Sequence, residues 1–210
     1  MSRSELAPVV EEVVGKAIER LRECPDFTAP KREQITPIIT SAIRFLARCL
    51  DEQEGGSSGR TAYLFDPDAD EDDLRTDLVD WFKGNGLYGM YREPQNIGGG
   101  RPDITFAFNE FRFVIELKRE LVDATEPSLG RYLRQPAAYL AADIAVGMLI
   151  VLDLSSGPLA AHIRDNVWVD RLESPEPEGT DRCFLVIRVP GNRKSPSRLL
   201  SATNRELREQ

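Results

Sequence analysis

The spacing of apolar residues predicts two long helices at the start of the chain. Over residues 6–21 apolar residues recur at helical spacing, Ser4 offers an N-cap, and Pro25 ends the pattern. A second apolar stripe with the same period covers residues 31–52. Because the two segments follow each other closely, we expect them to form a helical hairpin.

A polar, glycine-rich stretch over residues 54–59 follows the second predicted helix. Such a composition is typical of a linker or a mobile loop. We therefore divide the chain into a helical hairpin over residues 1–54, a flexible linker over residues 55–60 and a second domain over residues 61–210. The hairpin is expected to serve in docking or oligomerisation.

Beyond residue 60 the pattern mixes helical and strand periods. Residues 145–152 are apolar throughout, which is typical of a strand buried on both faces of a sheet. The order of elements predicts an α/β fold, an α-β-β-β-α-β sandwich with a mixed central sheet, preceded by the helical hairpin. The expected helices cover residues 70–83, 128–143 and 158–166, and the expected strands cover residues 87–92, 102–108, 111–118, 145–152 and 183–189.

Composition agrees with an ordinary globular protein. The 210 residues are 41% hydrophobic and 30% charged, with a net charge of −8. No run reaches the roughly 18 apolar residues of a membrane span, and the N-terminus lacks the apolar run of a signal peptide. Cys24, Cys49 and Cys183 form no CxxC pair, so neither a disulfide framework nor a cysteine zinc site is indicated. We expect a cytoplasmic protein with no membrane partner.

Charge is distributed unevenly along the chain. Residues 66–80 hold eight acids and one base, which accounts for most of the net negative charge. Residues 182–210 hold seven bases and two acids. The basic segment is compatible with a phosphate-binding face and equally with a solvated tail.

The predicted strand over residues 111–118 carries an acid and a base on one face. Side chains alternate along a strand, so Glu116 and Lys118 point the same way. The opposite, apolar face consists of Phe113, Ile115 and Leu117. A tight turn at residues 109–110 pairs this strand with the preceding one and brings Asp103 towards Glu116. We expect two carboxylates and an ammonium group to converge there.

Two carboxylates in such an arrangement repel each other unless a cation lies between them. Their oxygens suit Mg²⁺, for which Mn²⁺ substitutes. Such an ion can polarise a phosphodiester and lower the pKa of a bound water, while a lysine orients the water or stabilises the phosphate. The pattern therefore indicates metal-dependent hydrolysis of a phosphodiester.

The segments around these residues resemble a known family. Gly100-Arg101-Pro102-Asp103, followed by Glu116-Leu117-Lys118, resembles the PD-(D/E)xK motif of the restriction-endonuclease-like nuclease superfamily, and the order of elements is similar to that of its fold. The resemblance covers residues 70–153. It implies that Asp103 and Glu116 bind the metal ion and that Lys118 is catalytic.

A second part of the resemblance lies in the predicted helix over residues 128–143. Gln135 and Tyr139 are similar to the QxxxY motif of RecB-like members, and their spacing puts them on one helical face. The resemblance implies that both support the site or the substrate. Pro136 is unfavourable inside a helix, so the helix either begins near this residue or kinks there.

Many members of the superfamily add an acid from the helix that precedes the sheet. Glu71 lies within the apolar arc of the predicted helix over residues 70–83 and so faces the sheet, which makes it a candidate for metal binding and catalysis. Acids in a first helical turn also complement the helix dipole without any metal. Glu93, near the end of the first predicted strand, is the competing acid.

Two functions follow from these patterns. The first is a Mg²⁺-dependent endo- or exonuclease that acts on nucleic acid, DNA in preference to RNA, as the effector of a bacterial antiviral defence or repair system. The second is a catalytically silent nuclease-like fold that binds nucleic acid or assembles into a homo-oligomer or a larger complex through its N-terminal helices. The intact trio of Asp, Glu and Lys favours the first.

Overall fold

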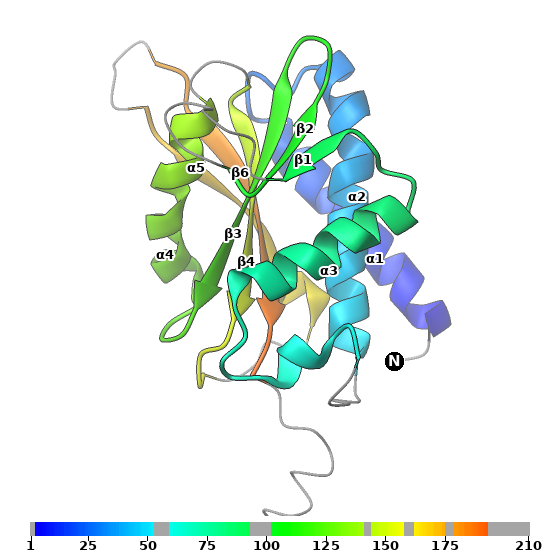
Figure 1. The fold of residues 1–210 in the computed structure, drawn as a ribbon. Coiled ribbons are helices and arrows are strands. Elements are labelled where there is room, and N and C mark those ends of the chain that lie inside the picture. Colours follow the sequence, from blue (N-terminus) through cyan, green and yellow to red (C-terminus); the bar gives the residue numbers. More distant parts are fainter. Residues whose placement is uncertain are drawn as a thin grey trace, which may run out of the picture.

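A central sheet with helices on both faces organises the molecule (Figure 1). The computed structural model describes residues 3–52, 59–92, 102–140, 144–157, 162–174 and 179–192. Within these residues the sheet has six strands in the order β1-β2-β3-β4-β6-β5. The strands are β1 (Met90–Arg92), β2 (Ile104–Ala107), β3 (Arg112–Glu120), β4 (Val146–Asp153), β5 (Val167–Leu172) and β6 (Arg182–Pro190).

The directions of the strands make the sheet mixed. β1, β2 and β3 are consecutive antiparallel neighbours, and β4 runs parallel to β3 after a helical connection. β6 is parallel to β4, and β5 adds an antiparallel edge to β6. The mixed α/β class expected from the sequence is confirmed.

Helices cover the sheet in two groups. α1 (Arg3–Leu21), α2 (Ala29–Asp51) and α3 (Glu71–Gly84) pack on one face, while α4 (Glu126–Leu129) and α5 (Arg134–Tyr139) lie over the other (Figure 1). Short 3₁₀ turns are η1 (Ala62–Phe65), η2 (Gly130–Leu133) and η4 (Ile163–Asn166). In the part of the chain that the structure describes, no helix combines the length and apolar character needed to cross a membrane.

Local signals define the start of α3. Asp70 is its N-cap, and the Asp70 side chain accepts hydrogen bonds from the backbone N–H groups of Asp72 and Asp73. The Asp73 side chain accepts in return from the Asp70 N–H group, which completes a capping box. This cap sets the position of Glu71, the first residue of the helix.

We expect Asp70→Ala to lower the free energy of unfolding by about 1 kcal/mol, because two N–H groups of the first turn lose their acceptor. Urea denaturation followed by circular dichroism measures the change. Asp68→Ala is the control, since Asp68 is exposed and precedes the cap. Equal stability of the Asp70→Ala protein and the wild type would contradict the capping role.

The larger apolar cluster joins the N-terminal hairpin to the sheet. Its members come from all three long helices and from the strands, and they include Leu21, Phe45, Leu78, Ile115 and Ile187. The apolar stripes of both hairpin helices therefore lie in the same core as the strands. Docking or oligomerisation through the hairpin would use the faces of α1 and α2 that point away from the sheet. Most of the predicted linker, residues 55–58, lies outside the described residues.

The smaller apolar cluster lies on the opposite face of the sheet. Val114 of β3 packs there with residues of β4, β6 and the helical segment 126–140. Phe113 and Ile115, its neighbours in β3, belong to the larger cluster. Residues of β3 therefore alternate between the two faces as the sequence predicts.

A buried ion pair ties α3 to α2. Arg48 of α2 donates to Asp77 of α3, whose side chain is only 3% exposed, and the Tyr63 hydroxyl donates to the same carboxylate at 3.1 Å. The Arg48 guanidinium also lies over the rings of Phe45 and Trp81, at 4.9 and 5.2 Å from their centroids. These contacts hold α3 against the hairpin.

The helix expected over residues 128–143 is broken in the structure. Residues 126–139 form α4, a 3₁₀ turn and then α5, and residues 141–143 lie outside the described part. Pro136 occupies the first turn of α5, where its missing N–H group needs no partner. Of the two alternatives at this proline, the structure selects the one in which a helix begins just before it.

The segment between β4 and β6 also differs from the expectation. Of the helix expected over residues 158–166, the described residues form only the 3₁₀ turn η4. β5, which directly follows this turn, has no counterpart among the expected strands. It is a half-buried edge strand whose conformation depends on pairing with β6, and such pairing leaves little signal in the local sequence.

Candidate active site

β3 extends beyond the end of β2, and part of its edge therefore has no strand partner among the residues that the structure describes. β2 pairs with β3 only as far as Ile104 opposite Ile115. Residues 116–120 of β3 continue alongside β4 on the other edge. The backbone N–H groups of Leu117 and Arg119 lie on the open edge and require other acceptors.

Two carboxylates accept hydrogen bonds from this open edge. Asp103, the residue before β2, accepts a hydrogen bond from the Leu117 N–H group through Oδ2 at 2.8 Å. Glu71, in the first turn of α3, accepts from the Arg119 N–H group through Oε1 at 3.0 Å. The expected orientation of Glu71 towards the sheet is confirmed, and β3 brings together acids from two different elements.

Glu116 and Lys118 form an ion pair on β3. Lys118 Nζ donates to Glu116 Oε1 at 2.7 Å, and the Glu116 side chain is only 1% exposed. The second oxygen of Glu116, Oε2, is buried and has no hydrogen-bond partner among the described residues. A buried carboxylate oxygen without a donor costs free energy, so this atom favours the approach of a further donor or a cation.

Burial and like charge act together on these acids. Burial, with the negative charges of Asp103 and Glu71, raises the pKa of Glu116 to about 7 against the opposing effect of Lys118. Burial also raises the pKa of Asp103 above its ordinary value. For Lys118, burial alone would lower the pKa, but the ion pair with Glu116 and the other acids raise it. Glu71, Asp103, Glu116 and Lys118 interact as one group, which we call the carboxylate–lysine cluster.

Arg75 supplies a second cation to the carboxylate–lysine cluster. Its guanidinium donates to Asp103 Oδ1 at 3.0 Å and to Asp72 at 2.6 and 3.1 Å. With the Leu117 N–H group on Oδ2, both oxygens of Asp103 are hydrogen-bonded. Arg75 is not among the site residues predicted from the sequence. Its position one helical turn after Glu71, on the same face of α3, is the signal that could have identified it.

The remaining predicted site residues lie elsewhere or are not described. Gln135 is in α5 with an exposed side chain, and α5 packs on β3 and β4. Tyr139 ends α5, but its side chain lies outside the described residues, as does the whole of Glu93. The supporting role of Gln135 and Tyr139 therefore stays a prediction.

The donor set of the cluster suits a hard divalent cation by its chemistry. It offers carboxylate oxygens, and one of them, Glu116 Oε2, has no hydrogen-bond partner within the described part of the chain. As the described side chains are placed, His, Cys, Asp and Glu residues form no group of three or more that could hold a metal ion. The positive charge beside the acids comes instead from Arg75 and Lys118. A bound cation would therefore compete with Arg75 for Asp103.

Because the pKa of Glu116 is raised in the folded protein, we expect the free energy of unfolding to decrease as the pH rises from about 4.5 to 7. In this window the folded protein keeps a proton on Glu116 that the unfolded chain has lost, so stability decreases as the pH rises. Glutamine cannot ionise, so we expect Glu116→Gln to remove this decrease. Above neutral pH the decrease in the wild type amounts to about 3 kcal/mol.

Urea denaturation of the wild type and the Glu116→Gln protein across this pH range measures the effect. Glu110→Gln is the control, because Glu110 is exposed in the turn between β2 and β3. A stability difference between Glu116→Gln and the wild type that stays constant with pH would contradict the shifted pKa.

Comparison of the chain with protein-family models, curated proteins and solved structures finds no match.

Proposed function

We propose that the chain is a metal-dependent nuclease of the PD-(D/E)xK type, which hydrolyses phosphodiester bonds of nucleic acid, DNA in preference to RNA. One observation carries the proposal: Glu71, Asp103, Glu116 and Lys118 meet where β2 and β3 separate. The chain order of α3, the three antiparallel strands, the α4–α5 segment and β4 supports the same assignment. An effector role in antiviral defence or repair is part of this proposal.

Asp103, Glu116 and Glu71 are the residues that would hold Mg²⁺ or Mn²⁺. Such an ion supplies a Lewis acid that polarises the scissile phosphate and lowers the pKa of an attacking water. The proposal fits the unpartnered Glu116 Oε2 and the mutual repulsion of the acids, which a divalent charge would relieve.

Lys118 acts through its positive charge and its N–H donors. Its side chain is 15% exposed and its ammonium is held by Glu116, so it is a fixed charge at the boundary between the buried cluster and solvent. An ammonium in this position can donate to an attacking water or to a phosphate oxygen as negative charge develops there. Partial burial strengthens that interaction, because there is less water to screen it.

Asp103 is held in one orientation by the protein itself. The Leu117 N–H group fixes Oδ2 and the Arg75 guanidinium fixes Oδ1. Residues that are held in place before substrate binds lose less entropy in the reaction. Arg75 would thus position Asp103 in the absence of a cation and release one oxygen when a cation arrives.

A second candidate function is a catalytically silent fold that binds nucleic acid or assembles into a larger complex. Asp103 and Glu71 have a structural role here, because they satisfy N–H groups of β3. Asp103 is also neutralised by Arg75 without any metal. Both observations are what a silent site would show, so the two functions need a direct test.

The test combines cleavage with metal binding. Linear and circular DNA and RNA are incubated with the wild type or Asp103→Asn in the presence of Mg²⁺ or Mn²⁺, and Mn²⁺ binding is measured by calorimetry. Asp72→Asn is the matched control, since Asp72 shares Arg75 as its partner but is exposed. We expect cleavage and tight Mn²⁺ binding that Asp103→Asn abolishes and Asp72→Asn retains.

Equal cleavage by the wild type and Asp103→Asn would overturn the assigned site. A wild type that neither binds Mn²⁺ nor cleaves any of these substrates would favour the silent fold.

A further inference from the structure

Two buried thiols meet at the start of β6, outside the carboxylate–lysine cluster. Cys24 lies in the turn between α1 and α2, and Cys183 is the second residue of β6. The Cys24 thiol donates to the Ala145 carbonyl oxygen at 3.6 Å, and the Cys183 backbone N–H donates to the same oxygen at 2.8 Å. The Ala145 carbonyl oxygen thus joins the two cysteine residues, and each thiol shifts the pKa of the other. Two cysteines far apart in the sequence thus come together at one carbonyl oxygen.

The environment of the pair favours a thiolate. The interaction with Cys183 lowers the pKa of the Cys24 thiol, while the same interaction raises the pKa of Cys183. Arg171 of β5 is the cross-strand partner of Cys183 and places a positive charge beside both thiols. A thiolate next to a cation is the reactive form of cysteine. The pair therefore offers one sulfur that favours the thiolate and a second cysteine that binds the same carbonyl oxygen.

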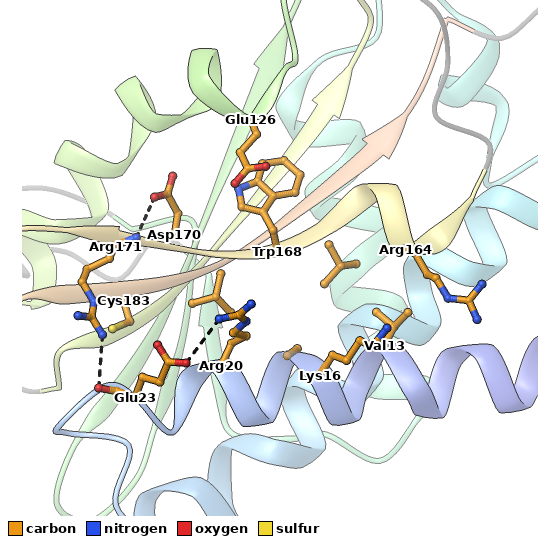
Figure 2. A pocket seen from close by; sticks show the side chains of 13 residues that line it. Val13, Lys16, Arg20, Glu23, Glu126, Arg164, Trp168, Asp170, Arg171 and Cys183 are labelled. Carbon is orange, nitrogen blue, oxygen red and sulfur yellow. Dashed lines mark hydrogen bonds and ion pairs between the residues drawn. The ribbon is translucent and has the colours of Figure 1, made fainter.

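A cavity of about 430 Å³ reaches Cys183 of this pair (Figure 2). Cys183 and Arg171 line it, together with Trp168 and side chains of α1. Lys16 and Arg20, which also line the cavity, have side chains that are 70% and 73% exposed, so the cavity is open to solvent on the α1 side. A molecule as small as a hydroperoxide can pass through such an opening, even though both cysteines are 2% exposed.

We propose that Cys24 and Cys183 are a peroxide-reactive thiol pair, which a hydroperoxide converts into a disulfide that links the α1–α2 turn to β6. The proposal is independent of the nuclease assignment. It changes the expectation from the sequence, where the wide separation of the cysteines gave no indication of a disulfide.

The reaction balances with hydrogen peroxide as the oxidant. The thiolate of the pair attacks one peroxide oxygen, the O–O bond breaks, and the leaving hydroxide takes up a proton to form water. The sulfenic acid that results is attacked by the second sulfur, an S–S bond forms, the S–O bond breaks, and a second water leaves. The two sulfurs together lose two electrons, and these reduce one peroxide to two waters.

The test uses the full chain and counts thiols. The protein is treated with hydrogen peroxide, unfolded, and titrated with a thiol reagent, and peptides are mapped by mass spectrometry without reduction. We expect the titre to fall from three thiols to one, with a single cross-linked peptide pair that contains Cys24 and Cys183. The intact mass should fall by two hydrogens and return after reduction.

Three single variants make the assignment specific. Cys24→Ser and Cys183→Ser should each abolish the cross-link, whereas Cys49→Ser should retain it, because Cys49 is buried at the far end of α2 from this pair. Peptide mapping of the wild type gives an answer even where a variant does not fold. Retention of all three thiols after treatment, a cross-link that involves Cys49, or only over-oxidised cysteines would overturn the proposal.

Discussion

Lys118→Met is expected to lower the rate of phosphodiester cleavage by about 10²–10³-fold, if the proposed nuclease function holds. The reason is that the Lys118 ammonium is the cation of the carboxylate–lysine cluster that borders on solvent, beside the buried Glu116. Methionine keeps the length of the side chain and removes the charge and the donors. Initial rates with Mg²⁺ at saturating nucleic acid measure the effect.

Two comparisons separate catalysis from folding in this experiment. Lys83→Met removes an exposed lysine from the last turn of α3 and should leave the rate unchanged. Lys118→Arg restores the charge but not the compact ammonium geometry, so it should recover only part of the rate. A Lys118→Met protein that is folded and cleaves at the wild-type rate would remove Lys118 from the mechanism.

Asp77→Ala is expected to lower the free energy of unfolding by about 3–5 kcal/mol. Asp77 is buried, and it accepts from both the Arg48 guanidinium and the Tyr63 hydroxyl. Its removal leaves a partly buried cation and a buried hydroxyl without their acceptor, and the desolvation cost of both is then uncompensated. Equilibrium denaturation in urea at neutral pH measures the loss.

The matched control for this prediction lies on the same helix. Asp80 also forms an ion pair, with Arg60, but their side chains are 37% and 67% exposed. Asp80→Ala should therefore cost only about 0–1 kcal/mol. The double variant Asp77→Leu/Arg48→Met replaces the buried pair by apolar groups and should recover most of the stability that Asp77→Ala loses. A cost for Asp77→Ala no greater than that for Asp80→Ala would contradict the role of the buried pair.

Local patterns in the sequence predicted much of the fold. The alternation along residues 111–118 identified β3 and its two faces, because a strand puts successive side chains on opposite sides. The helical period likewise located α1, α2 and α3 to within a few residues. β5 was missed, since its conformation depends on pairing with β6, whereas a helix that begins near Pro136 was one of the two alternatives that the sequence left open.

The relative placement of the site residues was predictable in part. A hairpin register alone implies that Asp103 approaches Glu116, and the helical arc of Glu71 implies that it faces the sheet. The hydrogen bonds from N–H groups of β3 to Asp103 and Glu71 were not predictable, because they follow from the unequal lengths of β2 and β3. The meeting of Cys24 and Cys183 at the Ala145 carbonyl oxygen is likewise a product of tertiary packing.

The open edge of β3 also matters for self-association. An unpaired strand edge is a template on which a second chain can add a strand, which is a common route to aggregation. The carboxylates of Asp103 and Glu71 occupy the N–H groups that an incoming strand would need, and their charge repels the carbonyl oxygens of another backbone. The same two acids therefore protect the chain against intermolecular sheet growth, and their loss would expose it.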